Sequence, residues 1–64
     1  MAVGPLEQAA RAVTERATYR FHLGMAYLAS NEWVHARAAL QEALRIDPNF
    51  DGAAEARKAL AAIR

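Results

Sequence analysis

Apolar residues recur every three or four positions along most of this chain, which is the spacing of one face of an α-helix. The first such run covers residues 5–15 and opens with a proline, which suits the first turn of a helix. A second run over 18–29 is apolar on two faces, so its helix is expected to lie between two neighbours. Further helices are expected over 33–46 and from 51 to the C-terminus, and no segment alternates like a strand. The pattern therefore predicts an all-α fold.

Short polar residues and a proline mark the turns between these helices. Residues 30–32 predict the first turn, because Ser, Asn and Glu occur there and short polar side chains hydrogen-bond to nearby backbone. Residues 47–49 predict the second, since a proline pushes the preceding residue out of the helical region. Asp51 or Asn49 is expected to cap the last helix. Four apolar residues are expected on the inner face of that helix, namely Ala53, Ala56, Leu60 and Ile63.

Gly24 lies in the middle of the helix predicted over 18–29, where glycine costs roughly 1 kcal/mol of helix propensity relative to alanine. A close approach of another helix backbone would explain a glycine at this point. Ala36 is the expected facing residue, and Leu40 and Ala43 continue the alternation of large and small side chains. The alternative is that Gly24 is simply tolerated in an ordinary helical hairpin.

The 34 residues from Ala17 to Phe50 resemble the tetratricopeptide repeat, whose signature has the same length. Arg20 departs from the pattern, because the family often has tryptophan there. The resemblance implies an antiparallel helix-turn-helix repeat, part of an α-solenoid, that acts as a protein-binding scaffold. Seven positions carry the resemblance and are expected to pack the two helices together: Leu23, Gly24, Tyr27, Ala36, Leu40, Ala43 and Pro48.

The segments on either side of this stretch resemble half-repeats. Residues 51–64 resemble the first helix of a following repeat or a C-terminal capping helix. The whole chain, 1–64, is expected to be one domain in which 17–50 is the full repeat. Residues 1–16 resemble the second helix of a preceding repeat, because three of them stand 34 positions before a counterpart: Leu6, Ala9 and Ala10 before Leu40, Ala43 and Leu44.

The break between the first two helices is weakly encoded. Thr14 stands where the repeat pattern expects a proline, so the backbone keeps an N–H group at this position. We expect separate helices on either side of residues 16–17, and the alternative is one continuous helix. Because a lost hinge favours exchange of elements between chains, that alternative predicts a domain-swapped dimer.

Unpaired half-repeats also predict self-association. Repeats bury their apolar faces by stacking on neighbours, and about three are needed for stability. A chain of this size buries only about 60% of its unfolded surface, so support from another chain is expected. We therefore expect a homo-oligomer or a subunit of a larger complex, formed head-to-tail or by domain swapping.

By resemblance to the family, the first helix of the repeat lines a concave groove that binds a protein or peptide. Phe21 and Met25 stand where carboxylate-clamping members have polar or basic residues, so a partner helix or an extended apolar segment is expected instead. The alternative is that Phe21, Met25 and Leu28 pack on the first helix or on another copy, which would make the chain a purely structural element of a complex. Seven residues are expected to face the groove: Thr18, Phe21, His22, Met25, Leu28, Asn49 and Phe50.

Two further groups of residues suggest packing or metal binding. Trp33 stands where the family has a bulky residue wedged between hairpins, and it is expected, like Tyr19 and Tyr27, to pack against other helices. Glu32 and His35 form a Glu-x-x-His pair of the kind that holds iron in helical bundles. Glu32 is instead expected to complement the dipole at a helix N-terminus. No metal and no cofactor are therefore expected.

Composition and charge argue against several classes of function. Eight basic and seven acidic residues are interspersed and give a net charge of +1, without the basic face typical of nucleic-acid binding. No apolar run is long enough to insert into a membrane, and no signal peptide is predicted, so a cytoplasmic location is expected. The chain has no cysteine nucleophile and no glycine-rich phosphate loop, and Ser30 has no evident base beside it. We therefore expect a protein that is not an enzyme.

Overall fold

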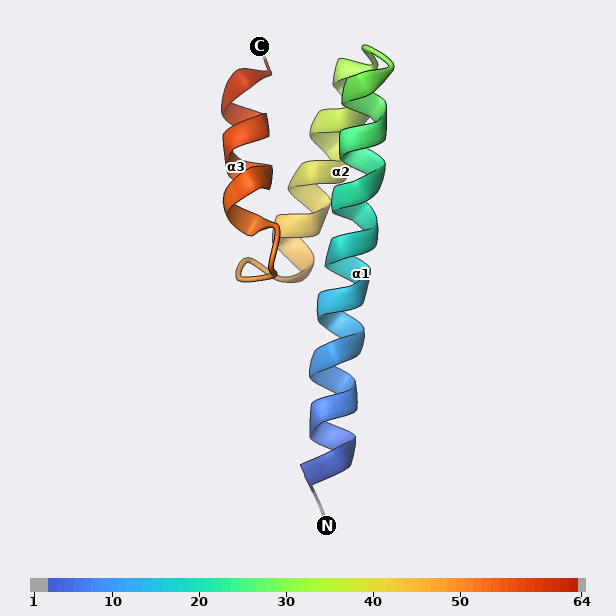
Figure 1. Cartoon of the computed structure of the whole chain (residues 1–64), viewed down its shortest axis with the longest axis vertical. Coiled ribbons are helices and arrows are strands. Elements are labelled where there is room, and N and C mark those ends of the chain that lie inside the picture. Colours follow the sequence, from blue (N-terminus) through green and yellow to red (C-terminus); the bar gives the residue numbers. More distant parts are fainter. Residues whose placement is uncertain (1–2, 64) are drawn as a thin grey trace.

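Three α-helices make up the computed structural model, which describes the backbone of residues 3–63 and the side chains of residues 8–63. They are α1 (Val3–Ala29), α2 (Trp33–Ile46) and α3 (Ala53–Ala62), and no strand occurs within residues 3–63. Helices α1 and α3 run in the same direction and α2 runs in the opposite one (Figure 1). The first half of α1 extends beyond α2 and α3, which gives the molecule a longest dimension of 47 Å (Figure 1).

One continuous helix replaces the two that were expected at the start of the chain. The expected separation into 5–15 and 18–29 is wrong, and the alternative of a single helix is confirmed, since α1 runs from Val3 to Ala29. The physical reason lies at Thr14, which, unlike proline, keeps the backbone N–H that the helix ladder needs. Residues 12–17 contain no glycine, and Ala12, Glu15 and Arg16 are good helix formers, so nothing in this stretch ends the helix.

The turn predicted over residues 30–32 is confirmed, and α2 has its predicted bounds. Asn31 adopts a left-handed conformation with φ of 60°. Its N–H donates to the carbonyl of Leu28 at 3.0 Å, and the N–H of Glu32 donates to the carbonyl of Tyr27 at 2.8 Å. These two bonds form a Schellman motif, which satisfies carbonyl groups at the end of α1.

The second turn ends α2 as predicted, but the cap of the next helix differs from the prediction. Helix α2 ends at Ile46, before the proline, and the carboxylate of Asp47 accepts the N–H of Asn49 at 3.1 Å. The N-cap of α3 is Gly52, without a side-chain bond, so the predicted caps Asn49 and Asp51 are wrong. One N–H of the first turn is satisfied by the backbone instead, because the N–H of Ala53 donates to the carbonyl of Phe50 at 2.9 Å.

Small side chains dominate the core. Leu40 is the largest side chain that is fully buried, and most of the other buried residues are alanines. On α3, Ala53 and Ala56 are buried, as is Ile63 just beyond its end, while Leu60 packs partly buried against them, which confirms the predicted inner face. Alanine-rich contacts allow the helix axes to approach closely, so this small core relies on proximity more than on bulk.

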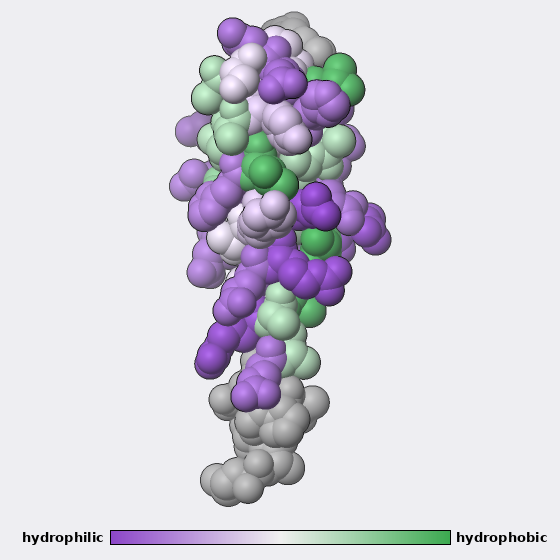
Figure 2. All heavy atoms as spheres, turned by 90° about the vertical axis from the view of Figure 1, so that its right-hand side faces the viewer, coloured by the Kyte–Doolittle hydropathy of each residue, from purple (hydrophilic) through white to green (hydrophobic). Residues whose placement is uncertain are grey.

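Within residues 3–63, no helix is both long enough and apolar enough to cross a membrane. Viewed from the α1 side, hydrophilic and hydrophobic side chains are intermixed over the surface (Figure 2). The hydrophobic areas on this side are small and separated by polar side chains (Figure 2).

Candidate functional site

Gly24 and Leu40 mark a close approach of α1 and α2. A Cβ atom added to Gly24 would lie 2.7 Å from Cγ and 2.8 Å from Cδ2 of Leu40, and 3.3 Å from its backbone nitrogen. The expected close approach at Gly24 is therefore present. Its facing residue is Leu40 and not Ala36, because Leu40 inserts into the space that the missing side chain leaves.

The residues expected to pack the two helices gather in this contact with one exception. Ala36 and Ala43 are fully buried beside Leu40, and Leu23 and Tyr27 are half-buried. Pro48 is the exception, since it is exposed in the turn after α2, where its carbonyl accepts a 2.7 Å hydrogen bond from Arg57. Its part in the structure is to end a helix.

The residues expected to line a groove lie mostly on one strip of α1. Thr18, Phe21, His22 and Met25 follow the spacing of one helix face. His22 is exposed and Met25 is 38% exposed, whereas Thr18 and Phe21 are half-buried. We call these four residues the α1 strip. Leu28, one turn further along, is half-buried and packs against the core.

Phe50 does not line an open groove, contrary to the prediction. It is only 4% exposed and belongs to the core. Its ring meets the ring of Phe21 edge-to-face, with centroids 5.6 Å apart and an interplanar angle of 61°. Gly52 makes room for this pair, because a Cβ atom there would lie 2.8 Å from the ring of Phe50 and 3.1 Å from that of Phe21. The aromatic pair thus connects α1 to the segment that leads into α3, while Asn49 beside it is exposed.

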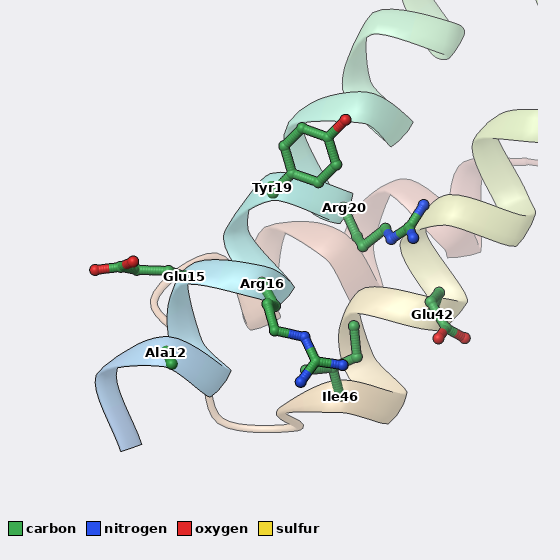
Figure 3. Close-up of a pocket in the computed structure, with 7 residues that line it drawn as sticks. All are labelled: Ala12, Glu15, Arg16, Tyr19, Arg20, Glu42 and Ile46. Carbon is green, nitrogen blue, oxygen red and sulfur yellow. The ribbon is translucent and has the colours of Figure 1, made fainter. Parts of the chain in front are cut away.

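Two adjoining depressions lie along the seam between α1 and α2, where no groove was predicted. Their volumes are about 370 and 340 Å³, and both are open to solvent. They share Arg20 and Glu42, so they form one furrow, which we call the seam groove. The larger depression is shown in Figure 3 and is lined by Ala12, Glu15, Arg16, Tyr19, Arg20, Glu42 and Ile46. The smaller one is lined by Arg20, Leu23, Tyr27, His35, Ala38, Ala39 and Glu42.

The seam groove carries charge of both signs. Arg16 and Arg20 extend from α1 toward α2 (Figure 3), and the guanidinium of Arg20 lies 5.9 Å from the centroid of the Tyr19 ring. Glu42 accepts two hydrogen bonds from Arg45, one of them 2.8 Å long from Nε to Oε2. The hydrogen bond from Arg45 lowers the pKa of Glu42, and the positive charges of Arg45, Arg20 and Arg16 lower it further. Glu42 and Arg45 form the one ion pair found in the described part of the chain.

Two aromatic residues that were expected to pack are exposed instead. Tyr19 is 61% exposed and Trp33 is 50% exposed. The prediction that they pack against other helices is therefore wrong for the helices of this chain. Tyr27 does pack against the core as expected, and its ring lies 5.2 Å from that of His35. The sequence signal that was missed is that Tyr19 shares a helix face with Glu15 and Arg16, which is the face turned to the seam groove.

The Glu-x-x-His pair does not assemble a metal site in the described residues. Glu32 is exposed at the N-cap of α2 and makes no capping bond with its side chain. The ring of His35 lies against Tyr27. Across the part of the chain that the structure describes, no three histidine, aspartate or glutamate side chains converge in a way that could hold a metal ion.

The family follows from these contacts together with a comparison of the sequence with family models. The tetratricopeptide repeat model matches residues 17–50, which is just over half of the chain. The chain belongs to the tetratricopeptide repeat family. Comparisons with curated proteins and with solved structures found no match. Tetratricopeptide repeats mediate protein–protein interactions and are generally not catalytic. The matched repeat begins at Ala17, inside α1, so the first half of that helix precedes the repeat.

Proposed function

We propose that the chain is a scaffolding module that binds a helix or an extended apolar segment of a partner protein along the α1 strip. The observation that supports this function is the accessibility of Met25, with His22 exposed and Phe21 half-buried on the same strip. Methionine is flexible and adapts to differently shaped apolar partners. Amphipathic helices bind such surfaces through anchors spaced three or four residues apart.

The chemistry of the strip favours an apolar partner over a charged one. Thr18, Phe21, His22 and Met25 include no lysine, arginine, aspartate or glutamate. A peptide carboxylate would therefore find no cation on this strip. Burial of Met25 against an apolar side chain would supply binding energy, at about 25 cal/mol per Å² of apolar surface covered.

The second part of the proposal is that the chain self-associates through its two half-repeat ends. The first half of α1 lies away from α2 and α3 (Figure 1). Helices of this length are marginal in water unless an apolar face is packed. Helix α3, at the other end, resembles the first helix of a following repeat or a capping helix, and it packs on α2.

The main alternative is a purely structural subunit, and a specific observation favours it as well. Tyr19, Trp33 and Val34 are exposed, the last of them by 80%. Exposed large apolar side chains mark surfaces that other proteins cover when they lie close together. In this alternative a further copy of the chain covers the α1 strip, and no separate ligand binds there.

A peptide titration tests the binding function. The probe is a synthetic 14-residue amphipathic helix with leucines on one face and neutral polar residues elsewhere, added to the isotopically labelled chain and followed by NMR. We expect shifts concentrated at the α1 strip, and loss of these shifts in Met25→Lys. Val34→Lys is the matched control, since it places the same charge on an exposed site of α2. Shifts of equal size in both variants, or no shifts at the strip, would overturn the proposal.

A further inference from the structure

The first half of α1 is largely uncovered by the rest of the described fold. We call residues 3–13 the arm. All the arm side chains that the structure describes, from Gln8 to Val13, are exposed. Most of the arm lies apart from α2 and α3 (Figure 1), and only its end near Ala12 borders α2. The arm is helical as a continuation of α1, and because a segment of this length is only marginally helical in water, a partner would stabilise it.

The arm continues the face of α1 that packs on α2. Ala17 is fully buried and belongs to the core. Val13 and Ala10 stand four and seven residues before it, which places them on the same helix face. This apolar stripe is therefore continuous with the α1–α2 interface and runs past the end of α2.

The arm also repeats the sequence of α2. Ala9 and Ala10 lie 34 positions before Ala43 and Leu44, and Ala43 is fully buried where α2 packs. An arm with the same pattern is suited to pack against an α1-like helix. The arm cannot fold back onto residues 17–50 of its own chain, because α1 continues through residues 14–17 without a turn.

The seam groove is long enough to hold the arm. Its α1 side extends from Ala12 to Tyr27, roughly 22 Å at about 1.5 Å per residue, and the arm is roughly 16 Å long. The groove begins at Ala12, next to the point where the arm leaves the rest of the molecule. Its walls offer Leu23 and Ile46 as apolar contacts for the small side chains of the arm.

We propose that the seam groove is the docking site for the arm of a second copy of this chain, so that two chains exchange arms. This inference rests on the self-association in the proposed function, and it replaces α3 with the seam groove as the surface that the arm contacts in the other copy. The two α1 helices lie antiparallel about a twofold axis close to Glu15 and Arg16. Each arm then lies along the second half of α1 in the other copy, and the same contacts are made twice.

Charges near the axis fit this arrangement. Glu15 and Arg16 are exposed and line the larger depression of the seam groove. In an antiparallel pair, Glu15 of each copy faces Arg16 of the other, which gives two reciprocal ion pairs. A head-to-tail assembly, with the arm against α3 of the next copy, would place these residues apart and would not close at two chains.

Sedimentation equilibrium of the full chain between micromolar and submillimolar concentration tests the stoichiometry. We expect a closed dimer, and loss of dimer in Ala9→Lys, which places a charge on the arm face. Val34→Lys is the control and should leave the dimer intact. Both sites are exposed, so circular dichroism should show the variants helical. A monomer throughout, or a series of higher oligomers, would overturn the inference.

A charge swap tests the antiparallel geometry. Glu15→Lys places like charges together in both reciprocal pairs, and Arg16→Glu does the same with the opposite sign. Each variant alone should weaken the dimer by roughly tenfold, and an equimolar mixture should restore it as a heterodimer. Dimers that neither variant weakens would show that self-association uses another surface, and would overturn arm exchange while leaving self-association standing. Peptide binding at the α1 strip is measured by the separate NMR titration. The absence of arm exchange would therefore leave the proposed peptide binding untouched.

Discussion

The hydroxyl of Thr14 donates a 3.0 Å hydrogen bond to Oδ2 of Asp47, which lies 33 residues further along the chain. The other carboxylate oxygen of Asp47 accepts the N–H of Asn49. A single carboxylate therefore connects α1 to the turn that ends α2. Thr14 also occupies the position where the repeat pattern expects proline, so one residue both allows α1 to continue and ties it to the following hairpin.

Removing the hydroxyl of Thr14 should destabilise the fold. Thr14→Val keeps the shape of the side chain, leaves Oδ2 of the half-buried Asp47 without this donor, and should cost about 1–2 kcal/mol of unfolding free energy. The measurement is urea unfolding at one fixed protein concentration, because self-association of the kind proposed would make stability depend on concentration. Thr18→Val, one turn further along α1, is the matched control and should cost less. In a double-mutant cycle with Asp47→Ala the two losses should be less than additive, and strict additivity would contradict the contact.

The turn after α1 predicts an improvement in stability. Asn31 is held in the left-handed region, which glycine adopts without strain and which asparagine tolerates better than most residues. Asn31→Gly should stabilise the fold by up to about 1 kcal/mol, and Asn31→Ala should destabilise it by about 1 kcal/mol. Thermal unfolding of both variants checks this, with Ser30→Ala as the neighbouring control. The same sign of change for Gly and Ala would contradict the left-handed conformation.

The ion pair on α2 predicts a specific pH dependence. The hydrogen bond from Arg45 and the charges around it lower the pKa of Glu42 in the folded chain. A carboxyl group whose pKa is lower when folded adds stability above its unfolded pKa, and that stability is lost as the pH falls through the folded pKa. Stabilisation by this pair is therefore present at neutral pH and is lost in the acid range, below the usual values for glutamate.

Arg45→Gln should raise the pKa of Glu42 and remove this acid-range component of stability. Arg20→Gln should raise it less, because Arg20 acts through charge alone. An NMR titration of the side-chain carboxyl carbon of Glu42 measures both shifts. A larger rise in Arg20→Gln than in Arg45→Gln would show that the hydrogen bond is not the main cause. Because Glu42 and Arg45 are at the surface, salt should reduce the shift.

Local sequence signals predicted helices α2 and α3 well. The bounds of α2 follow from two strong stop signals, an asparagine that tolerates the left-handed region and a proline. The close approach at Gly24 was predictable because a glycine in mid-helix is costly without a packing reason. Its partner was harder to identify, since choosing between Ala36 and Leu40 requires the relative shift of two helices, and spacing along one helix does not give it.

Features that depend on neighbours were the ones that sequence reasoning missed. Phe50 was assigned to a groove by its position in the repeat, but the room left by Gly52 lets its ring pair with Phe21 in the core. Tyr19 and Trp33 are aromatic and were expected to be buried, yet the helices that cover such positions in an array are not beside them here. The seam groove was missed because one wall of it begins at Ala12, and that wall depends on α1 continuing without a break at Thr14.

The contact between Gly24 and Leu40 gives the most direct test of the repeat packing. Gly24→Ala raises helix propensity by about 1 kcal/mol, which alone would stabilise α1. The added Cβ would lie 2.7 Å from Cγ of Leu40, a side chain that is fully buried and cannot move aside freely. Overpacking of this kind costs about 1–3 kcal/mol, so we expect a net loss of unfolding free energy.

Leu40→Ala shows whether that loss comes from this contact. By itself it should cost about 2–5 kcal/mol through the cavity it leaves. In the Gly24→Ala background it should cost less, because the new methyl group fills part of the cavity. Met25→Ala, a neighbouring change on an accessible residue of α1, should alter stability less than Gly24→Ala does. If Gly24→Ala proved stabilising, the helices would be further apart than the contact requires, and the scaffold role built on their close packing would lose its basis.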